Sequence, residues 1–129
     1  MAHPALMAQV VVIDDDESVR ESLPDLLRTL GFAAKAFASA EEFLAADCIA
    51  ATRCLLLDVA MPGMSGPELH QQLILRKHTI AIIFITARAD EALRQQLLRQ
   101  GAVECLFKPF SEQQLRIALE AAMQGSGGQ

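Results

Sequence analysis

Short apolar runs alternate along the chain with segments whose leucines recur at helical spacing. Each run breaks at polar or turn-forming residues, and the longest runs are apolar without interruption. Uninterrupted apolar runs of this length are typical of strands that are buried on both faces of a sheet. The five predicted strands cover residues 10–13, 32–37, 54–58, 81–85 and 103–107.

A helix is predicted after each of these strands. Val19, Leu23 and Leu27 share one face of the first helix, which we expect to end near Gly31. The starts of the other four are indicated by the capping residues Ser39, Ser65, Asp90 and Ser111. Alternating strands and helices predict an α/β fold, a doubly wound parallel sheet with helices on both faces.

Four of the five predicted strands end in chemically capable residues. Asp14 and Asp15 follow the first strand, Asp58 ends the third, Thr86 follows the fourth and Lys108 follows the fifth. The carboxyl ends of parallel strands share one edge of the sheet, so these side chains can gather there. Clustered carboxylates offer the oxygen ligands that suit Mg²⁺ beside phosphate. A carboxylate can also be the nucleophile in phosphoryl transfer, with Lys108 and Thr86 binding the phosphoryl oxygens.

Each of these residues also has a simpler structural interpretation. The Asp-Asp-Asp-Glu run at residues 14–17 could be only the N-cap and acidic first turn of a helix. Asp58 could be a cap, Thr86 a turn hydroxyl and Lys108 a solvated side chain. These interpretations would have to hold independently at four strand ends. The joint pattern therefore favours an aspartyl-phosphate site.

Composition and charge narrow the class of protein. The 129 residues are 52% hydrophobic and 21% charged, as expected for one compact domain. The net charge of −5 gives no basic surface for nucleic acid. No apolar run approaches the roughly 20 residues of a membrane span, and residues 1–9 lack signal-peptide features. Cys48, Cys54 and Cys105 show no metal-site spacing and indicate reduced thiols in a cytoplasmic protein.

The chain resembles the receiver domain of two-component response regulators in four blocks that occur in the same order. The blocks are Ile13-Asp14-Asp15-Asp16-Glu17, Leu57-Asp58-Val59-Ala60-Met61-Pro62-Gly63-Met64-Ser65-Gly66, Phe84-Ile85-Thr86-Ala87 and Phe107-Lys108-Pro109-Phe110. On this basis residues 1–124 are predicted to form the receiver domain. Residues 125–129, which are rich in glycine, are predicted to be a flexible C-terminal linker.

The resemblance implies a role for each matching residue. Asp58 would accept a phosphoryl group, and Asp14 and Asp15 would form an acidic pocket for Mg²⁺. Asp15, Asp58 and the backbone carbonyl of Ala60 would be the direct metal ligands. Thr86 would hydrogen-bond the phosphoryl oxygen and Lys108 would pair with it. The implied fold is flavodoxin-like (βα)5, with strand order 2-1-3-4-5 and a cis peptide bond between Lys108 and Pro109.

The resemblance also implies partners. The donor would be a histidine kinase. The Asp-Asp-Asp-Glu run, Phe43-Leu44 and Gly101-Ala102-Val103 are most similar to FixJ-type receivers, which usually precede a DNA-binding helix-turn-helix. In that subfamily phosphorylation promotes a homodimer through the fourth helix and fifth strand. A stand-alone regulator that acts by protein–protein interaction is the alternative. In such receivers an aromatic residue usually stands where this chain has Cys105, and its rotamer follows the threonine. Either signal coupling runs through other residues here, Phe107 or the fourth helix, or the switch is weakened.

Three other classes of protein fit the sequence less well. A flavin-binding protein would need a glycine- and hydroxyl-rich phosphate loop where this chain has acidic residues 14–17. An aspartyl-phosphate hydrolase commonly carries a second acid two residues after the nucleophile, but that residue is Ala60 here, so slow autodephosphorylation is expected. A degenerate receiver would lack some of the five key residues, and all are present.

Overall fold

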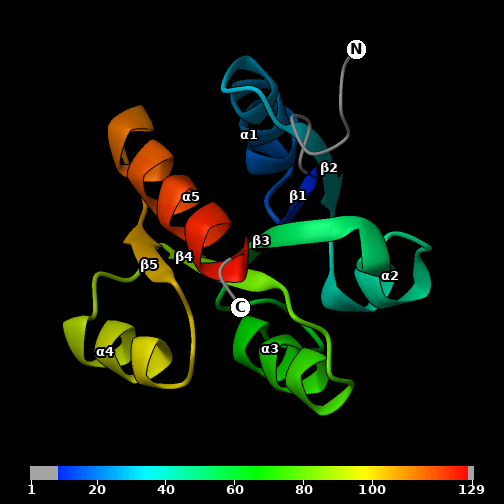
Figure 1. Cartoon of the computed structure of the whole chain (residues 1–129). Coiled ribbons are helices and arrows are strands. Elements are labelled where there is room, and N and C mark those ends of the chain that lie inside the picture. The colour runs from blue at the N-terminus through cyan, green and yellow to red at the C-terminus, as the bar shows by residue number, and fades with distance from the viewer. Residues whose placement is uncertain (1–8, 128–129) are drawn as a thin grey trace.

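The computed structural model describes residues 9–127, which form one parallel sheet with helices on both faces (Figure 1). The strands are β1 (Gln9–Ile13), β2 (Ala33–Phe37), β3 (Thr52–Asp58), β4 (Ala81–Thr86) and β5 (Glu104–Phe107). They lie in the order β2-β1-β3-β4-β5, and every neighbouring pair is parallel. The predicted flavodoxin-like fold and its strand order are confirmed.

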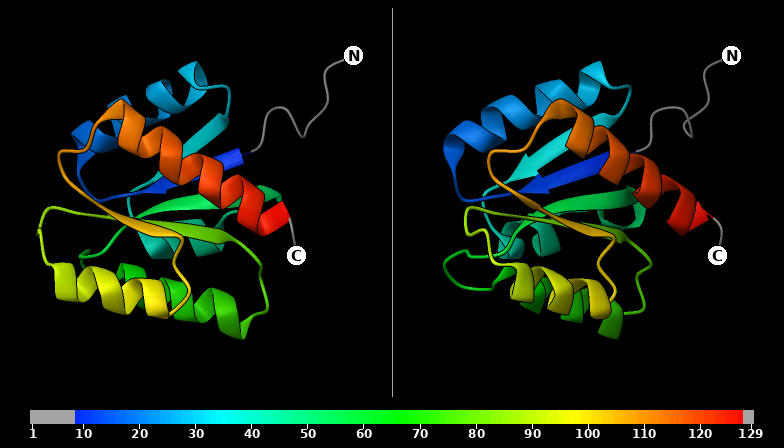
Figure 2. Two further views of the ribbon diagram at one scale, coloured as in Figure 1. Left: turned by 60° about the vertical axis from the view of Figure 1, so that its left-hand side comes forward. Right: turned by 90° about the vertical axis from the view of Figure 1, so that its left-hand side faces the viewer.

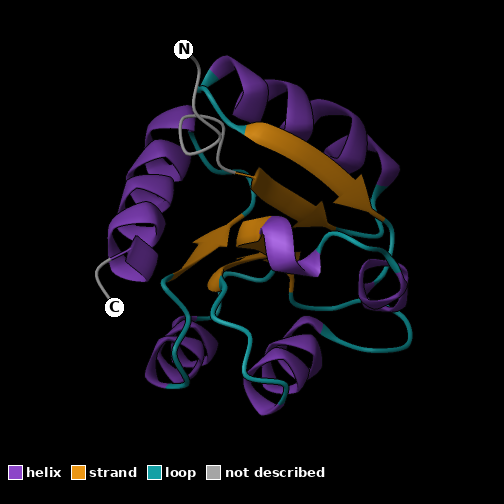
Figure 3. Cartoon of the chain, turned by 45° about the vertical axis from the view of Figure 1, so that its right-hand side comes forward, coloured by secondary structure: helices purple, strands orange, loops and turns teal. Residues whose placement is uncertain are grey.

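The helices lie in two layers, one on each face of the sheet (Figures 2 and 3). They are α1 (Glu17–Thr29), α2 (Ala40–Ala45), α3 (Gly66–Leu75), α4 (Glu91–Arg99) and α5 (Glu112–Gly127), with a short 3-10 turn at Ile49–Ala51. Helices α1 and α5 cover one face, and α2, α3 and α4 cover the other. None of the helices within residues 9–127 is long and apolar enough to cross a membrane.

The core consists of two apolar clusters, because successive side chains of a strand point to opposite faces of the sheet. In β1, Val10 and Val12 pack with α1 and α5. Val11 and Ile13 pack on the other face with α2, α3 and α4. All four side chains are fully buried, which explains why the strand is apolar without alternation.

Most strand ends lie within one residue of the prediction, and two boundaries differ by two residues or more. Strand β3 begins at Thr52, two residues earlier than predicted, because Thr52 pairs with Gln9 of β1 and its hydroxyl donates to the carbonyl of Cys48 at 2.7 Å. The backbone of α5 continues to Gly127, into the stretch predicted to be a linker, while residues 128–129 lie outside the described part of the chain. The linker itself stays a prediction.

Candidate functional site

The sheet register brings the strand-end residues to one edge. Ile13 of β1 is level with Leu57 of β3, so Asp14 and Asp58 are the next residues on two adjacent strands. Asp58 is level with Ile85 of β4, which places Thr86 one residue beyond it. Thr86 is level with Phe107 of β5, and Lys108 follows. The structure therefore gathers the five side chains that the sequence singled out.

Asp14, Asp15 and Asp58 form a cluster of carboxylates. One oxygen from each lies within 4.8 Å of the others, with Asp14 and Asp58 buried and Asp15 exposed. A divalent cation needs several oxygen ligands at short range and an open side for water and phosphate, and this arrangement supplies both. The residues present fit Mg²⁺.

Asp16 has the helix-capping role that was the alternative interpretation of the whole acidic run at residues 14–17. It is the N-cap of α1, and its Oδ1 accepts hydrogen bonds from the backbone nitrogen of Ser18 at 2.9 Å and from the Ser18 hydroxyl at 2.7 Å. The hydrogen bonds of Ser18 lower the pKa of the Asp16 carboxyl. The run thus divides, because Asp16 caps the helix while Asp14 and Asp15 turn toward Asp58.

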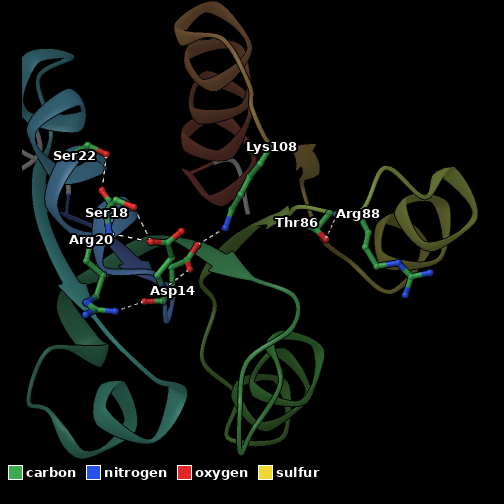
Figure 4. A network of polar contacts seen from close by, with 8 residues as sticks. Asp14, Ser18, Arg20, Ser22, Thr86, Arg88 and Lys108 are labelled. Carbon is green, nitrogen blue, oxygen red and sulfur yellow. Dashed lines mark hydrogen bonds and ion pairs between the residues drawn. The ribbon is translucent and has the colours of Figure 1, made fainter.

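Lys108 reaches into the cluster from the end of β5 and pairs with Asp14 (Figure 4). Its Nζ lies 2.8 Å from Oδ2 of Asp14, a carboxylate that is fully buried. Burial lowers the pKa of Lys108, but the hydrogen bond and negative charge of Asp14, together with Asp58, outweigh burial and raise it. The lysine is therefore charged. Its backbone is held by a hydrogen bond from the Lys108 nitrogen to the Thr86 carbonyl, and the Lys108–Pro109 peptide bond is cis.

Asp58 lies in an unfavourable electrostatic environment. Burial and then the negative charge of Asp14 raise the pKa of its carboxyl to about 7, with a further contribution from Asp15, while Lys108 opposes them. A carboxylate so placed gains from any cation that neutralises the cluster.

Thr86 is buried at the end of β4, and its hydroxyl oxygen accepts a hydrogen bond from the backbone nitrogen of Arg88 at 3.1 Å. It borders a cavity of about 210 Å³. The cavity is lined by Asp58, Val59, Ala60, Thr86, Ala87, Arg88, Leu93 and Lys108. A tetrahedral anion bound at Asp58 would therefore be next to the hydroxyl of Thr86 and the ammonium of Lys108.

The loop after β3 is held close to the sheet and to α3. The backbone nitrogen of Val59 donates to the Ile85 carbonyl, and the nitrogen of Gly66 donates to the Val59 carbonyl, both at 3.0 Å. A side chain at Gly66 would collide with the carbonyl of Asp58 and would lie 3.1 Å from the ring of Phe84. Glycine at this position therefore lets α3 begin directly beneath the end of β3.

The sequence did not reveal two side chains that contact the edges of the site. Arg20 of α1 donates to the backbone carbonyl of Asp14 at 3.0 Å (Figure 4). Glu41 of α2 accepts a hydrogen bond from the backbone nitrogen of Met64 at 2.9 Å, although 23 residues separate them. Both side chains contact backbone atoms, Arg20 six residues from Asp14 and Glu41 23 residues from Met64, and no local motif signals either contact.

The fold and the strand-end cluster agree with comparisons to known proteins. The chain matches the model for the response regulator receiver domain over residues 10–120. It therefore belongs to the family of response regulator receiver domains.

Its relatives include FixJ and other regulators, in agreement with the resemblance. The chain is 42% identical to nodulation protein W of Bradyrhizobium diazoefficiens, over 89% of this chain and 51% of the relative. It is 39% identical to the transcriptional regulatory protein FixJ of Azorhizobium caulinodans, over 93% of this chain and 57% of the relative. The crystal structure of FixJ-N superposes with a TM-score of 0.81 at 36% identity, covering 96% of each chain. The chain spans about half the length of the curated relatives it matches.

Proposed function

We propose that Asp58 accepts a phosphoryl group from a histidine kinase. An oxygen of the Asp58 carboxylate would attack the phosphorus of the donor, and the bond from phosphorus to the donor histidine nitrogen would break as the acyl phosphate forms. The observation that carries this proposal is the position of Asp58. Its carboxylate lines the cavity in which the acidic cluster, Thr86 and Lys108 meet.

Asp14, Asp15, Asp58 and the backbone carbonyl of Ala60 would hold Mg²⁺. Ala60 borders the cavity two residues after Asp58. When bound, the cation neutralises the carboxylates and the charge that develops on the phosphoryl oxygens. Without metal, the ion pair with Lys108 neutralises part of the negative charge of the buried Asp14.

Thr86 and Lys108 would bind the transferred group. The Thr86 hydroxyl would donate to one phosphoryl oxygen, and the Lys108 ammonium would pair with another while remaining near Asp14. These contacts arise only after modification and would draw Thr86 inward. This movement would carry the signal into α4, which begins a few residues beyond Thr86.

Receiver domains are generally not enzymes, and the residue at position 60 fits that generalisation. Alanine at this position supplies no acid or base to position a water for hydrolysis. We therefore propose Mg²⁺-dependent self-phosphorylation from small donors and slow autodephosphorylation as its only chemistry.

The proposed output surface consists of α4 and β5, which would form a phosphorylation-dependent homodimer. Arg94 of α4 lies against β5, where its Nε donates to Glu104 at 3.0 Å and its Nη1 donates to Glu91 at 2.8 Å. Gln95 and Arg99 of the same helix are exposed, while Arg94 forms an ion pair with Glu104 of β5.

The relatives include proteins named as transcriptional regulators, so we propose control of transcription in the cytoplasm through a C-terminal helix-turn-helix domain. The receiver domain itself would bind no DNA. A stand-alone regulator is the alternative, and the reading frame of the gene beyond Gln129 distinguishes the two.

The proposed function is tested with a small acyl phosphate and Mg²⁺. Intact mass should show one added phosphoryl group on the wild-type domain and none on Asp58→Asn. Uptake by Asp58→Asn at the wild-type rate would refute the assignment of Asp58.

A further inference from the structure

Glu41 is a surface residue of α2 that contacts the loop between β3 and α3. This loop, residues 59–65, carries the Ala60 carbonyl. The Oε2 atom of Glu41 accepts a hydrogen bond from the backbone nitrogen of Met64 at 2.9 Å. The contact connects helix α2 to a segment that begins one residue after the proposed phosphoacceptor.

The shape of the loop allows this close approach. Gly63 has a φ of +74°, a conformation that favours glycine, and a Cβ there would lie only 2.7 Å from the Oε2 atom of Glu41. The loop thus offers a bare backbone to the carboxylate at two consecutive residues. The hydrogen bond from Met64 lowers the pKa of the Glu41 carboxyl, as expected when the ionised form is the acceptor.

The two halves of the loop are held in different ways. Val59 is bonded through its backbone to Ile85 and Gly66, and the side chain of Met61 is buried in the core. The far half, Gly63 and Met64, is held by the carboxylate of Glu41 and leads into the N-cap of α3 at Ser65. Ala60 lies between these anchors and is itself exposed.

We propose that Glu41 is a positioning residue for the metal and phosphoryl site, acting through the loop that places the Ala60 carbonyl. This inference rests on the proposed function. Glu41 touches neither the cation nor the phosphoryl group. Its carboxylate holds Met64, and thereby limits how far the Ala60 carbonyl can move from the carboxylate cluster.

Glu42 provides a matched control in the same helical turn. Its side chain is also exposed, and its Oε1 accepts from the backbone nitrogen of Ala38, the residue before the N-cap of its own helix, at 3.1 Å. Both glutamates lie in the first turn of α2 and interact with the helix dipole. Removing either carboxylate should weaken α2, but only Glu41 contacts the loop.

The experiment compares the wild-type domain with Glu41→Ala, Glu41→Gln and Glu42→Ala. Amide hydrogen exchange at Met64, measured by NMR without metal, should be faster in Glu41→Ala and unchanged in Glu42→Ala. The dissociation constant for Mg²⁺ should rise about three- to tenfold in Glu41→Ala, at or below the low end of the roughly 10–100-fold effect of removing a group that orients a metal ligand. The dissociation constant of Glu42→Ala for Mg²⁺ should stay within about twofold of the wild-type value, as expected for an ordinary surface substitution.

Glu41→Gln keeps an acceptor oxygen and should recover much of the affinity for Mg²⁺. Gly63→Ala should reproduce Glu41→Ala because the added Cβ displaces the carboxylate. Equal Mg²⁺ affinities in Glu41→Ala and Glu42→Ala, or unchanged exchange at Met64 in Glu41→Ala, would overturn the inference. A wild-type domain that fails to bind Mg²⁺ or to be modified at Asp58 would instead refute the proposed function.

Discussion

Lys108 donates to Asp14, whose carboxylate is fully buried, across the end of the sheet at 2.8 Å. This ion pair neutralises part of the charge of Asp14. Asp58 is the other buried carboxylate of the acidic cluster, and burial and neighbouring negative charge raise its pKa to about 7. The site is thus electrostatically strained without a cation. That strain is the physical reason to expect a strong response to pH, to metal and to removal of single charges.

Removing the lysine should destabilise the fold. Lys108→Met would leave Asp14 buried without its partner, and breaking a fully buried pair costs about 3–5 kcal/mol. We expect about 2–3 kcal/mol because Lys108 is partly exposed to water. Urea unfolding without metal measures this loss. The double variant Lys108→Met with Asp14→Asn should recover most of the lost stability. Lys108→Met alone as stable as wild type would contradict a stabilising role for the ion pair.

Stability without metal should depend on pH through Asp58. Its folded pKa of about 7 lies above its ordinary value of 3.8, so the folded state binds a proton that the unfolded state releases. Asp58 therefore contributes stability that is fully present below pH 3.8 and is lost as the pH rises through about 7. The free energy of unfolding, measured between pH 5.5 and pH 8.5 to bracket roughly that value, should decline as the pH rises. The decline should be smaller in Asp58→Asn. A decline of equal size in both proteins would show that another group is responsible.

Mg²⁺ should stabilise the folded domain because the unfolded chain has no assembled cluster. At a Mg²⁺ concentration of about 100 times the dissociation constant, the free energy of unfolding should rise by about 2.7 kcal/mol. Thermal unfolding with and without Mg²⁺ measures the gain, with Asp15→Asn as the variant expected to lose most of it. Asp25→Asn alters an exposed carboxylate on α1 and should leave the gain intact. A midpoint that does not respond to Mg²⁺ would contradict the predicted metal site.

Gly66→Ala should impair both stability and phosphorylation, since the added methyl group would overlap the backbone of Asp58. Overpacking of this kind costs about 1–3 kcal/mol. Gly31→Ala is the control, because a Cβ there has open space and the φ of +100° imposes only a backbone cost. We expect slower self-phosphorylation per folded molecule in Gly66→Ala alone. Equal rates in the two variants would show that the close approach does not position Asp58.

The proposed dimer can be tested by reversing one exposed charge on α4. A phosphoryl mimic should tighten self-association of the wild-type domain, as measured by sedimentation, and Arg99→Glu should abolish that effect. Arg76→Glu makes the same charge change at the end of α3 and should have none. A wild-type domain that stays monomeric with and without the mimic, at concentrations well above micromolar, would contradict the proposed interface.

Much of the fold could be predicted because the apolar runs and capping residues are local signals. The uninterrupted apolar runs of β1 and β4 predicted strands buried on both faces. The side chains of Ser65 and Asp90 cap helices as expected. The gathering of Asp14, Asp58, Thr86 and Lys108 also followed from strand-end placement in a parallel sheet. Their chemical roles remain proposals.

The contacts that sequence alone did not predict depend on how the elements pack in three dimensions. Glu41 and Met64 meet only because α2 packs beside the loop after β3. Arg94 meets Glu104 because α4 lies along β5, and helical periodicity alone does not indicate that pair. The division of the acidic run, with Asp16 as the cap, likewise depends on where α1 begins.

Asp58 is the residue that we predict to carry the phosphoryl group. An acyl phosphate on an aspartate can be reduced with borohydride to homoserine, which marks the modified position for peptide sequencing by mass spectrometry. After phosphotransfer from a histidine kinase, we predict homoserine at position 58 and unmodified aspartate at positions 14 and 15. Homoserine at either of those positions, or a phosphoryl group that resists reduction and lies elsewhere, would contradict the account.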